Sequence, residues 1–109
     1  MVKAISESEF DESVKEGLSV VDFSATWCGP CQMLKPVLED ASGEFDGKVK
    51  FFAVDVDEAE DLSRKLGVMA VPSIFVFKDG EQVAMTTGFQ PKDALVSWVN
   101  GAIARVFSR

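Results

Sequence analysis

The segment Trp27-Cys28-Gly29-Pro30-Cys31 holds both cysteines of the 109-residue chain, and the rest of the fold can be predicted outward from it. It follows an apolar run, Leu18-Ser-Val-Val-Asp-Phe-Ser24, and precedes a segment whose apolar residues keep helical spacing. A run as apolar as this one is typical of a strand that is covered on both faces. The sequence therefore predicts a central strand that delivers two cysteines to the start of a helix.

Periodicity and turn residues predict the other elements. Strands are expected at residues 2–5, 18–24, 49–56, 73–78 and 81–87. Helices are expected after the capping-box pattern at 6–9, after the second cysteine, over 59–66 and from Pro91 onward. The order β-α-β-α-β-α-β-β-α combines crossover helices, which join parallel strands, with one hairpin at Asp79-Gly80. This order predicts an α/β fold, a central mixed β-sheet flanked by helices, in a single domain over residues 1–109.

The chain is acidic, with 18 Asp and Glu against 11 Lys and Arg and a net charge of −7. It offers no basic stripe for phosphate groups, which argues against nucleic acid as a partner. The acidity serves solubility or the selection of basic partner surfaces. The first residues show no apolar signal core, and no run approaches the roughly 18 apolar residues of a membrane span. We therefore expect a cytoplasmic protein with no membrane partner.

The two cysteines are expected to do redox chemistry. Only the thiolate of a cysteine attacks, and the free N–H groups and dipole of a helix N-terminus favour that anion. Cys28 is predicted at the loop edge of such a terminus and is the candidate nucleophile. Cys31 is predicted one turn further in, where it can attack a mixed disulfide that Cys28 has formed. The spacer Gly29-Pro30 lets the two sulfur atoms bond within one turn, and Pro30 lacks an N–H that would need a partner.

Three other roles for a cysteine pair fit this sequence less well. A structural disulfide across so short a loop constrains the unfolded chain little. Structural zinc usually takes four Cys or His ligands, whereas this chain has two Cys and no His, so no metal is predicted. A c-type haem site needs His after the second cysteine, and that residue is Gln32.

The segment Val21-Asp-Phe-Ser-Ala-Thr-Trp-Cys-Gly-Pro-Cys31 closely resembles the active-site segment of the thioredoxin family. The resemblance covers nearly the whole chain, through motifs at family-like spacings: Pro36, Val54-Asp-Val-Asp57, Val71-Pro72, Asp79-Gly80 and Gly88. It implies the thioredoxin fold and a general protein-disulfide reductase that acts on disulfide-containing proteins. It also implies that thioredoxin reductase, an NADPH-dependent flavoenzyme, recharges the dithiol. No bound cofactor is implied, since the electrons travel in the cysteine pair.

The resemblance further implies a docking surface beside the dithiol. It implies a cis peptide bond before Pro72, with the backbone of Val71 free to pair with an extended substrate strand. Substrate contacts are implied for six residues, Trp27, Gly29, Pro30, Val71, Pro72 and Gly88. Two of them have plainer alternatives, since Trp27 could be a packing residue and Gly88 could simply end a strand.

Asp22 lies within the apolar strand, where a charged carboxylate is costly, so its pKa should be raised. The matching acid of the family assists deprotonation of the second cysteine, which makes Asp22 the candidate general base for Cys31. The alternative is a structural carboxyl group bonded to backbone or water. Many bacterial members carry Lys where this chain has Ala53, and we expect Asp22 to lack that ion pair and stay protonated to higher pH. Gln32 also replaces a common Lys and removes one positive charge near the thiolate.

Two rival functions remain open on the same sequence. An oxidase or isomerase would share the fold. Family members with His beside the second cysteine are more oxidising. The spacer Gly29-Pro30 lacks that cation and so favours a reductant. A binding module, in which the dithiol is dispensable, would also use a small apolar patch around Trp27. A variant without both cysteines that keeps the biological activity would indicate the binding module.

Overall fold

The computed structural model describes residues 1–107 and confirms the predicted order of elements. The strands are β1 (Val2–Ala4), β2 (Leu18–Ser24), β3 (Val49–Asp55), β4 (Ser73–Lys78) and β5 (Glu81–Thr87). The helices are α1 (Phe10–Val14), α2 (Gly29–Gly43), α3 (Glu60–Lys65) and α4 (Lys92–Phe107). Two short 3-10 helices that were not predicted, η1 (Glu7–Glu9) and η2 (Val56–Glu58), precede α1 and α3.

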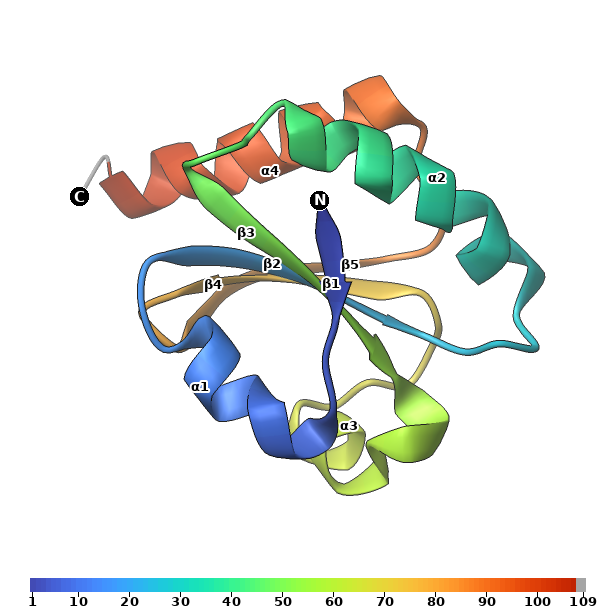
Figure 1. Ribbon diagram of the computed structural model, residues 1–109. Helices are drawn as coiled ribbons and strands as arrows, with labels where there is room; N and C mark the ends of the chain where they lie inside the picture. The colour runs from blue at the N-terminus through green and yellow to red at the C-terminus, as the bar shows by residue number, and fades with distance from the viewer. Residues whose placement is uncertain (108–109) are drawn as a thin grey trace.

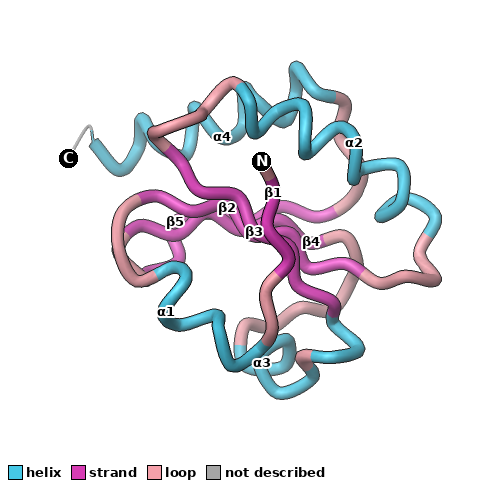
Figure 2. Tube along the Cα trace, viewed as in Figure 1, coloured by secondary structure: helices cyan, strands magenta, loops and turns pink. Residues whose placement is uncertain are grey.

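The strands form one mixed sheet in the order β1-β3-β2-β4-β5. β3 runs parallel to β1 and β2, whereas β4 runs antiparallel to β2 and β5. β2 is therefore the central strand, as its apolar sequence predicted, and five of its seven residues are buried. Helices α2 and α4 cover one face of the sheet, and α1 and α3 cover the other (Figures 1 and 2).

The core is divided by the sheet into two clusters, because successive side chains of a strand point to opposite faces. Val20 of β2 packs beneath α2 and α4, with Leu34 and Leu95. Val21 and Phe23 pack on the opposite face, beneath α1 and α3. Alternate residues of the central strand thus belong to different cores, and a polar residue in this strand must lie in one of them.

Four predicted bounds are wrong, each by one residue. β1 ends before Ile5, although the N–H of Ile5 still bonds the Ala53 carbonyl at 2.9 Å. β3 ends before Val56, because the Asp55 carboxylate accepts a bond of 2.9 Å from the N–H of Asp57 and starts η2. α3 begins one residue after Ala59 and ends at Lys65. Local side-chain capping, which the apolar spacing does not show, accounts for the end of β3.

The hairpin between β4 and β5 turns at Asp79-Gly80, as predicted. Both residues have positive φ, 51° and 85°, as a type I′ turn requires. The Asp79 carboxylate accepts hydrogen bonds from Lys78 Nζ at 2.6 Å and from the N–H of Gly17 at 2.7 Å. These bonds lower the pKa of Asp79, the Lys78 bond most of all. The turn is thereby joined to the loop that precedes β2.

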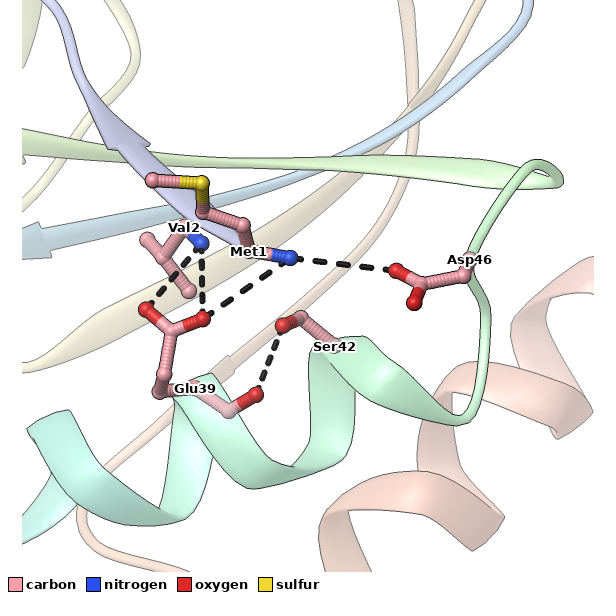
Figure 3. Close-up of polar contacts among 5 residues, drawn as sticks. All are labelled: Met1, Val2, Glu39, Ser42 and Asp46. Carbon is pink, nitrogen blue, oxygen red and sulfur yellow. Dashed lines mark hydrogen bonds and ion pairs between the residues drawn. The ribbon is translucent and has the colours of Figure 1, made fainter.

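The edge strand β1 is tied to α2 through Glu39 (Figure 3). The N–H of Val2 lies 3.2 and 3.3 Å from the two carboxylate oxygens of Glu39. The amino group of Met1 lies 3.7 Å from Glu39 Oε2 and 3.8 Å from Asp46 Oδ1. The Glu39 carboxylate is therefore engaged with the start of β1.

Candidate active site

Cys28 and Cys31 form a disulfide at the start of α2, with their Cα atoms 5.2 Å apart. Cys28 is the N-cap of the helix, and its sulfur accepts a hydrogen bond of 3.2 Å from the N–H of Cys31. Cys28 is 6% exposed and Cys31 is fully buried. Solvent therefore reaches the sulfur of Cys28 rather than that of Cys31. Once the disulfide is reduced, the N–H of Cys31 and the helix dipole can stabilise the same sulfur as a thiolate.

Gln32 fixes the loop that precedes the cysteines. Its side-chain nitrogen lies 3.4 Å from the carbonyl oxygen of Ala25 and 3.3 Å from that of Thr26. The Ala25 carbonyl also accepts a bond of 3.3 Å from the N–H of Cys28. The sequence had shown Gln32 only as a lost positive charge, since nothing local marks a side chain that reaches back six or seven residues.

The loop before β4 brings Val71 and Pro72 against the disulfide. Their peptide bond is cis, as the family resemblance implied. The carbonyl oxygen of Val71 lies 3.7 Å from Sγ of Cys28, and within residues 1–107 the N–H of Val71 makes no hydrogen bond. Gly88, which follows β5, donates its N–H to the carbonyl oxygen of Pro72 at 2.9 Å. The structure thus brings these three candidate substrate-contact residues together with Cys28.

Trp27 lies on the surface beside the disulfide, 71% exposed. Its indole Nε1 donates a hydrogen bond of 2.8 Å to Oδ2 of Asp57, which follows β3. An indole so exposed contributes little to a core, which argues against the packing alternative for Trp27. Gly29 and Pro30, in the first turn of α2, are exposed as well. Sequence reasoning expected Asp57 to be only a surface residue at a strand end and so missed its contact with Trp27.

An apolar hollow of about 300 Å³ lies beside Trp27 and Val71. Its lining consists of Trp27, Val56, Ser63, Val68, Met69, Ala70 and Val71. Met69 is 96% exposed, so the hollow is bordered by an apolar side chain that the fold does not use for packing. Exposed apolar groups next to a reactive sulfur suit the docking of a protein substrate. Residues 68–70 were not predicted as site residues because they form no recognisable motif.

Asp22 is 1% exposed in β2. It lies on the face that α2 covers, because Val20, two residues earlier, packs beneath that helix. Its Oδ1 has no hydrogen-bond partner among the described residues. Burial raises the pKa of Asp22 to about 7, and the positive charge of Lys35 opposes part of that rise. The predicted rise is confirmed, and no hydrogen bond joins Asp22 to Cys31 within residues 1–107.

The described part of the chain shows neither a candidate metal site nor a helix that could span a membrane. Residues 1–107 contain no group of three or more His, Cys, Asp or Glu side chains placed to hold a metal ion. None of the helices in that range has both the length and the apolar character needed to cross a bilayer.

Known proteins match this chain over most of its length. The family model named Thioredoxin matches residues 1–101. The thioredoxin of Staphylococcus haemolyticus (strain JCSC1435) is 50% identical over 91 residues, which cover 84% of this chain and 88% of that protein. Over the same shares of each chain, the thioredoxin of Staphylococcus saprophyticus subsp. saprophyticus is 48% identical and that of Staphylococcus aureus (strain N315) is 45% identical. With its disulfide-forming cysteine pair at the start of α2, the chain belongs to the thioredoxin family and is a protein thiol–disulfide oxidoreductase.

Proposed function

We propose that this chain is a general reductant of protein disulfides in which Cys28 attacks, Cys31 resolves and Asp22 accepts a proton. One observation supports the assignment most strongly: the N–H of Cys31 donates to Sγ of Cys28, and Cys28 is the more exposed of the two. A donor at a helix N-terminus stabilises the thiolate that it faces. Cys28 is therefore the cysteine that can be both ionised and reached.

The proposed reaction has two exchange steps. The Cys28 thiolate attacks one sulfur of the substrate disulfide, and the other substrate sulfur leaves as a thiolate. Cys31 then gives its proton to Asp22 and attacks Sγ of Cys28, which releases the second substrate sulfur and forms the Cys28–Cys31 disulfide. The substrate gains two electrons and, after protonation, two thiols, while the cysteine pair loses two electrons and two protons.

The substrate is proposed to lie as an extended strand along Val71. The unpaired N–H of Val71 supports this, because an extended peptide binds through main-chain hydrogen bonds. The 3.7 Å contact between Val71 and Cys28 would then bring the strand close to the attacking sulfur. The remaining proposed contacts are Trp27, Gly29, Pro30, Pro72 and Gly88.

The oxidised pair must be reduced again before another turnover. We propose that the electrons come from NADPH through thioredoxin reductase, the flavoenzyme that the family resemblance implies. The cysteine pair itself carries the electrons, so the scheme requires no bound cofactor. We also propose that the chain acts in the cytoplasm as one domain over residues 1–109, without a nucleic-acid or membrane partner. Its net charge of −7 supports the absence of a nucleic-acid partner.

NADPH-coupled reduction of insulin disulfides with a thioredoxin reductase tests this proposal. We expect turnover by the wild-type chain and only background by Cys28→Ser. Met33→Ser, which changes an exposed residue of the same helix, is the matched control and should retain activity. Wild-type turnover with dithiothreitol but not with the reductase would assign a different electron donor. No turnover with either donor would overturn the proposal that this chain reduces protein disulfides, and would favour a binding module.

A further inference from the structure

A cavity of about 170 Å³ lies between α2 and strands β2 and β3. Its lining includes Ser24, Gln32, Lys35, Ala53 and Asp55. Ala53 is the residue of β3 that pairs in register with Asp22. The cavity therefore reaches the strand next to the one that carries the buried carboxylate of Asp22. The small side chain of Ala53 leaves space there.

The carboxyl group of Asp22 and this cavity lie on the same side of the sheet. Val20 of β2 and Phe51 of β3 both pack in the cluster beneath α2 and α4. Residues two positions apart on a strand share a face, so Asp22 and Ala53 share that face with them. Lys35 belongs to the helix that covers this face and lines the same cavity.

Lys35 makes no ion pair or hydrogen bond with another residue of 1–107. Its helix offers an acid one turn later, Glu39, but that carboxylate is turned toward Met1 and the N–H of Val2 (Figure 3). The ammonium of Lys35 is thus left to act on Asp22, and its charge lowers the pKa of that group against the effect of burial.

The other groups around Asp22 do not favour its charged form. β3 supplies Asp55, a second negative charge whose carboxylate is bonded to the N–H of Asp57. β4 places the apolar Ile74 opposite Asp22. From α2 comes Cys31, which does not titrate while it is in the disulfide. Within the described chain, Lys35 is the cation that acts on Asp22.

We propose that Lys35 is a positioning residue whose ammonium, acting across the cavity beside Ala53, stabilises the ionised carboxylate of Asp22. Its consequence for catalysis rests on the proposed function, in which Asp22 takes the proton of Cys31. Lys35 is exposed, so the interaction is partly screened and weakens as salt is added. Ala53 contributes by its small size, because a larger apolar side chain would fill the space between the two charges.

An NMR titration of the Asp22 carboxyl carbon in the oxidised protein tests the interaction directly. In Lys35→Met we expect the midpoint to rise by about half a pH unit at low salt, and by less in 0.5 M NaCl. Lys35→Arg keeps the charge and should match the wild type. Lys48→Met, which removes an equal charge from an exposed site outside the cavity, is the control for net charge and should leave the midpoint unchanged.

A second variant tests whether charge in this cavity is what matters. Ala53→Lys in the Lys35→Met background returns an ammonium to the cavity, and we expect it to bring the midpoint back down to the wild-type value or below. A midpoint in Lys35→Met equal to that of the wild type, or moved equally by Lys48→Met, would overturn the proposal.

Rates of insulin reduction against pH separate this proposal from the function on which it rests. We expect Lys35→Met to move the rising limb of the profile to higher pH by about the same half unit, with the high-pH plateau unchanged. If the carboxyl titration moves but the rate profile does not, Lys35 acts on Asp22 as proposed and the proton-accepting role of Asp22 fails. If the titration does not move, the proposal for Lys35 fails whatever the rates show.

Discussion

The carbonyl oxygen of Val71 lies 3.7 Å from Sγ of Cys28, although 43 residues separate the two in the chain. The loop before β4 therefore covers the start of α2 and leaves Cys28 only 6% exposed. A substrate strand that bonds the N–H of Val71 would lie next to this sulfur. Reactivity would then depend on docking, because the same backbone that shields the sulfur also offers the docking contact.

Replacing Asp22 by Asn should stabilise the oxidised protein, and the gain should grow with pH. The pKa of Asp22 is about 7 when folded, against an ordinary value of 3.8, so between these values the unfolded chain has lost a proton that the folded protein keeps. The contribution of Asp22 to wild-type stability therefore falls as pH rises from about 4 to 7, by up to about 4 kcal/mol, and then levels off. Asn does not titrate and escapes this loss.

Urea unfolding at several pH values between 4 and 9 measures this difference. Asp40→Asn, an exposed acid of α2, serves as the control and should show no such trend. A stability difference between Asp22→Asn and the wild type that stays constant over this range would contradict the raised pKa.

Removing the carboxylate of Asp57 should weaken substrate docking through Trp27. The indole N–H donates to Asp57 at 2.8 Å, and a bond to a charged acceptor at an exposed site is worth about 1 kcal/mol. In Asp57→Ala we expect KM for a protein substrate to rise two- to fivefold with kcat nearly unchanged. Asp61→Ala removes the same charge from an exposed ion pair with Arg64 and should leave KM unaltered. A fall in kcat alone would show that Trp27 acts in chemistry rather than in docking.

Two glycine substitutions should change stability in opposite directions. Gly80 has φ of +85°, so Gly80→Ala forces a strained backbone and should cost about 1 kcal/mol. Gly101 lies inside α4, and a Cβ there meets nothing within 4 Å. Gly101→Ala should therefore stabilise the protein by about 0.5–1 kcal/mol through helix propensity. Thermal unfolding of the two variants compares them, and a shared sign would contradict one of these backbone assignments.

Loss of the Glu39 carboxylate should loosen β1. Glu39 accepts from the N–H of Val2 and pairs with the amino group of Met1, both at exposed sites (Figure 3). Glu39→Ala should cost about 0.5–1 kcal/mol in unfolding free energy and speed amide exchange in β1. Asp40→Ala, next to it on α2, is the control. Equal stability of the two variants would show that the contact contributes nothing measurable.

The sheet could be predicted because its signals are local. Residues 18–24 show their burial by composition, and Asp79-Gly80 is a turn signal of two residues whose positive φ values the structure confirms. The cysteine pair and its place at the start of α2 follow from the same kind of local pattern. The cis bond before Pro72 came from the family resemblance, because the sequence by itself shows only a proline before a strand.

The rest of the site depends on contacts between distant residues. Trp27 and Asp57 are 30 residues apart, and no periodicity indicates that the end of β3 meets the loop after β2. Ala53 suggested that Asp22 lacks a cation, whereas the packing of α2 over β2 supplies Lys35 from a different element. A single sequence shows which strand carries Asp22, but which helix residue lies above it depends on how the helix packs.

Trapping of the mixed disulfide tests whether Cys28 attacks and Cys31 resolves. Cys31→Ser and Cys28→Ser, both reduced, are mixed with a disulfide-bonded protein, and the adducts are identified by mass spectrometry after non-reducing digestion. We expect a stable adduct through Cys28 in Cys31→Ser, because the resolving thiol is missing, and at least tenfold less adduct in Cys28→Ser, whose remaining thiol is fully buried. Preferential capture through Cys31 would contradict these roles of the two cysteines.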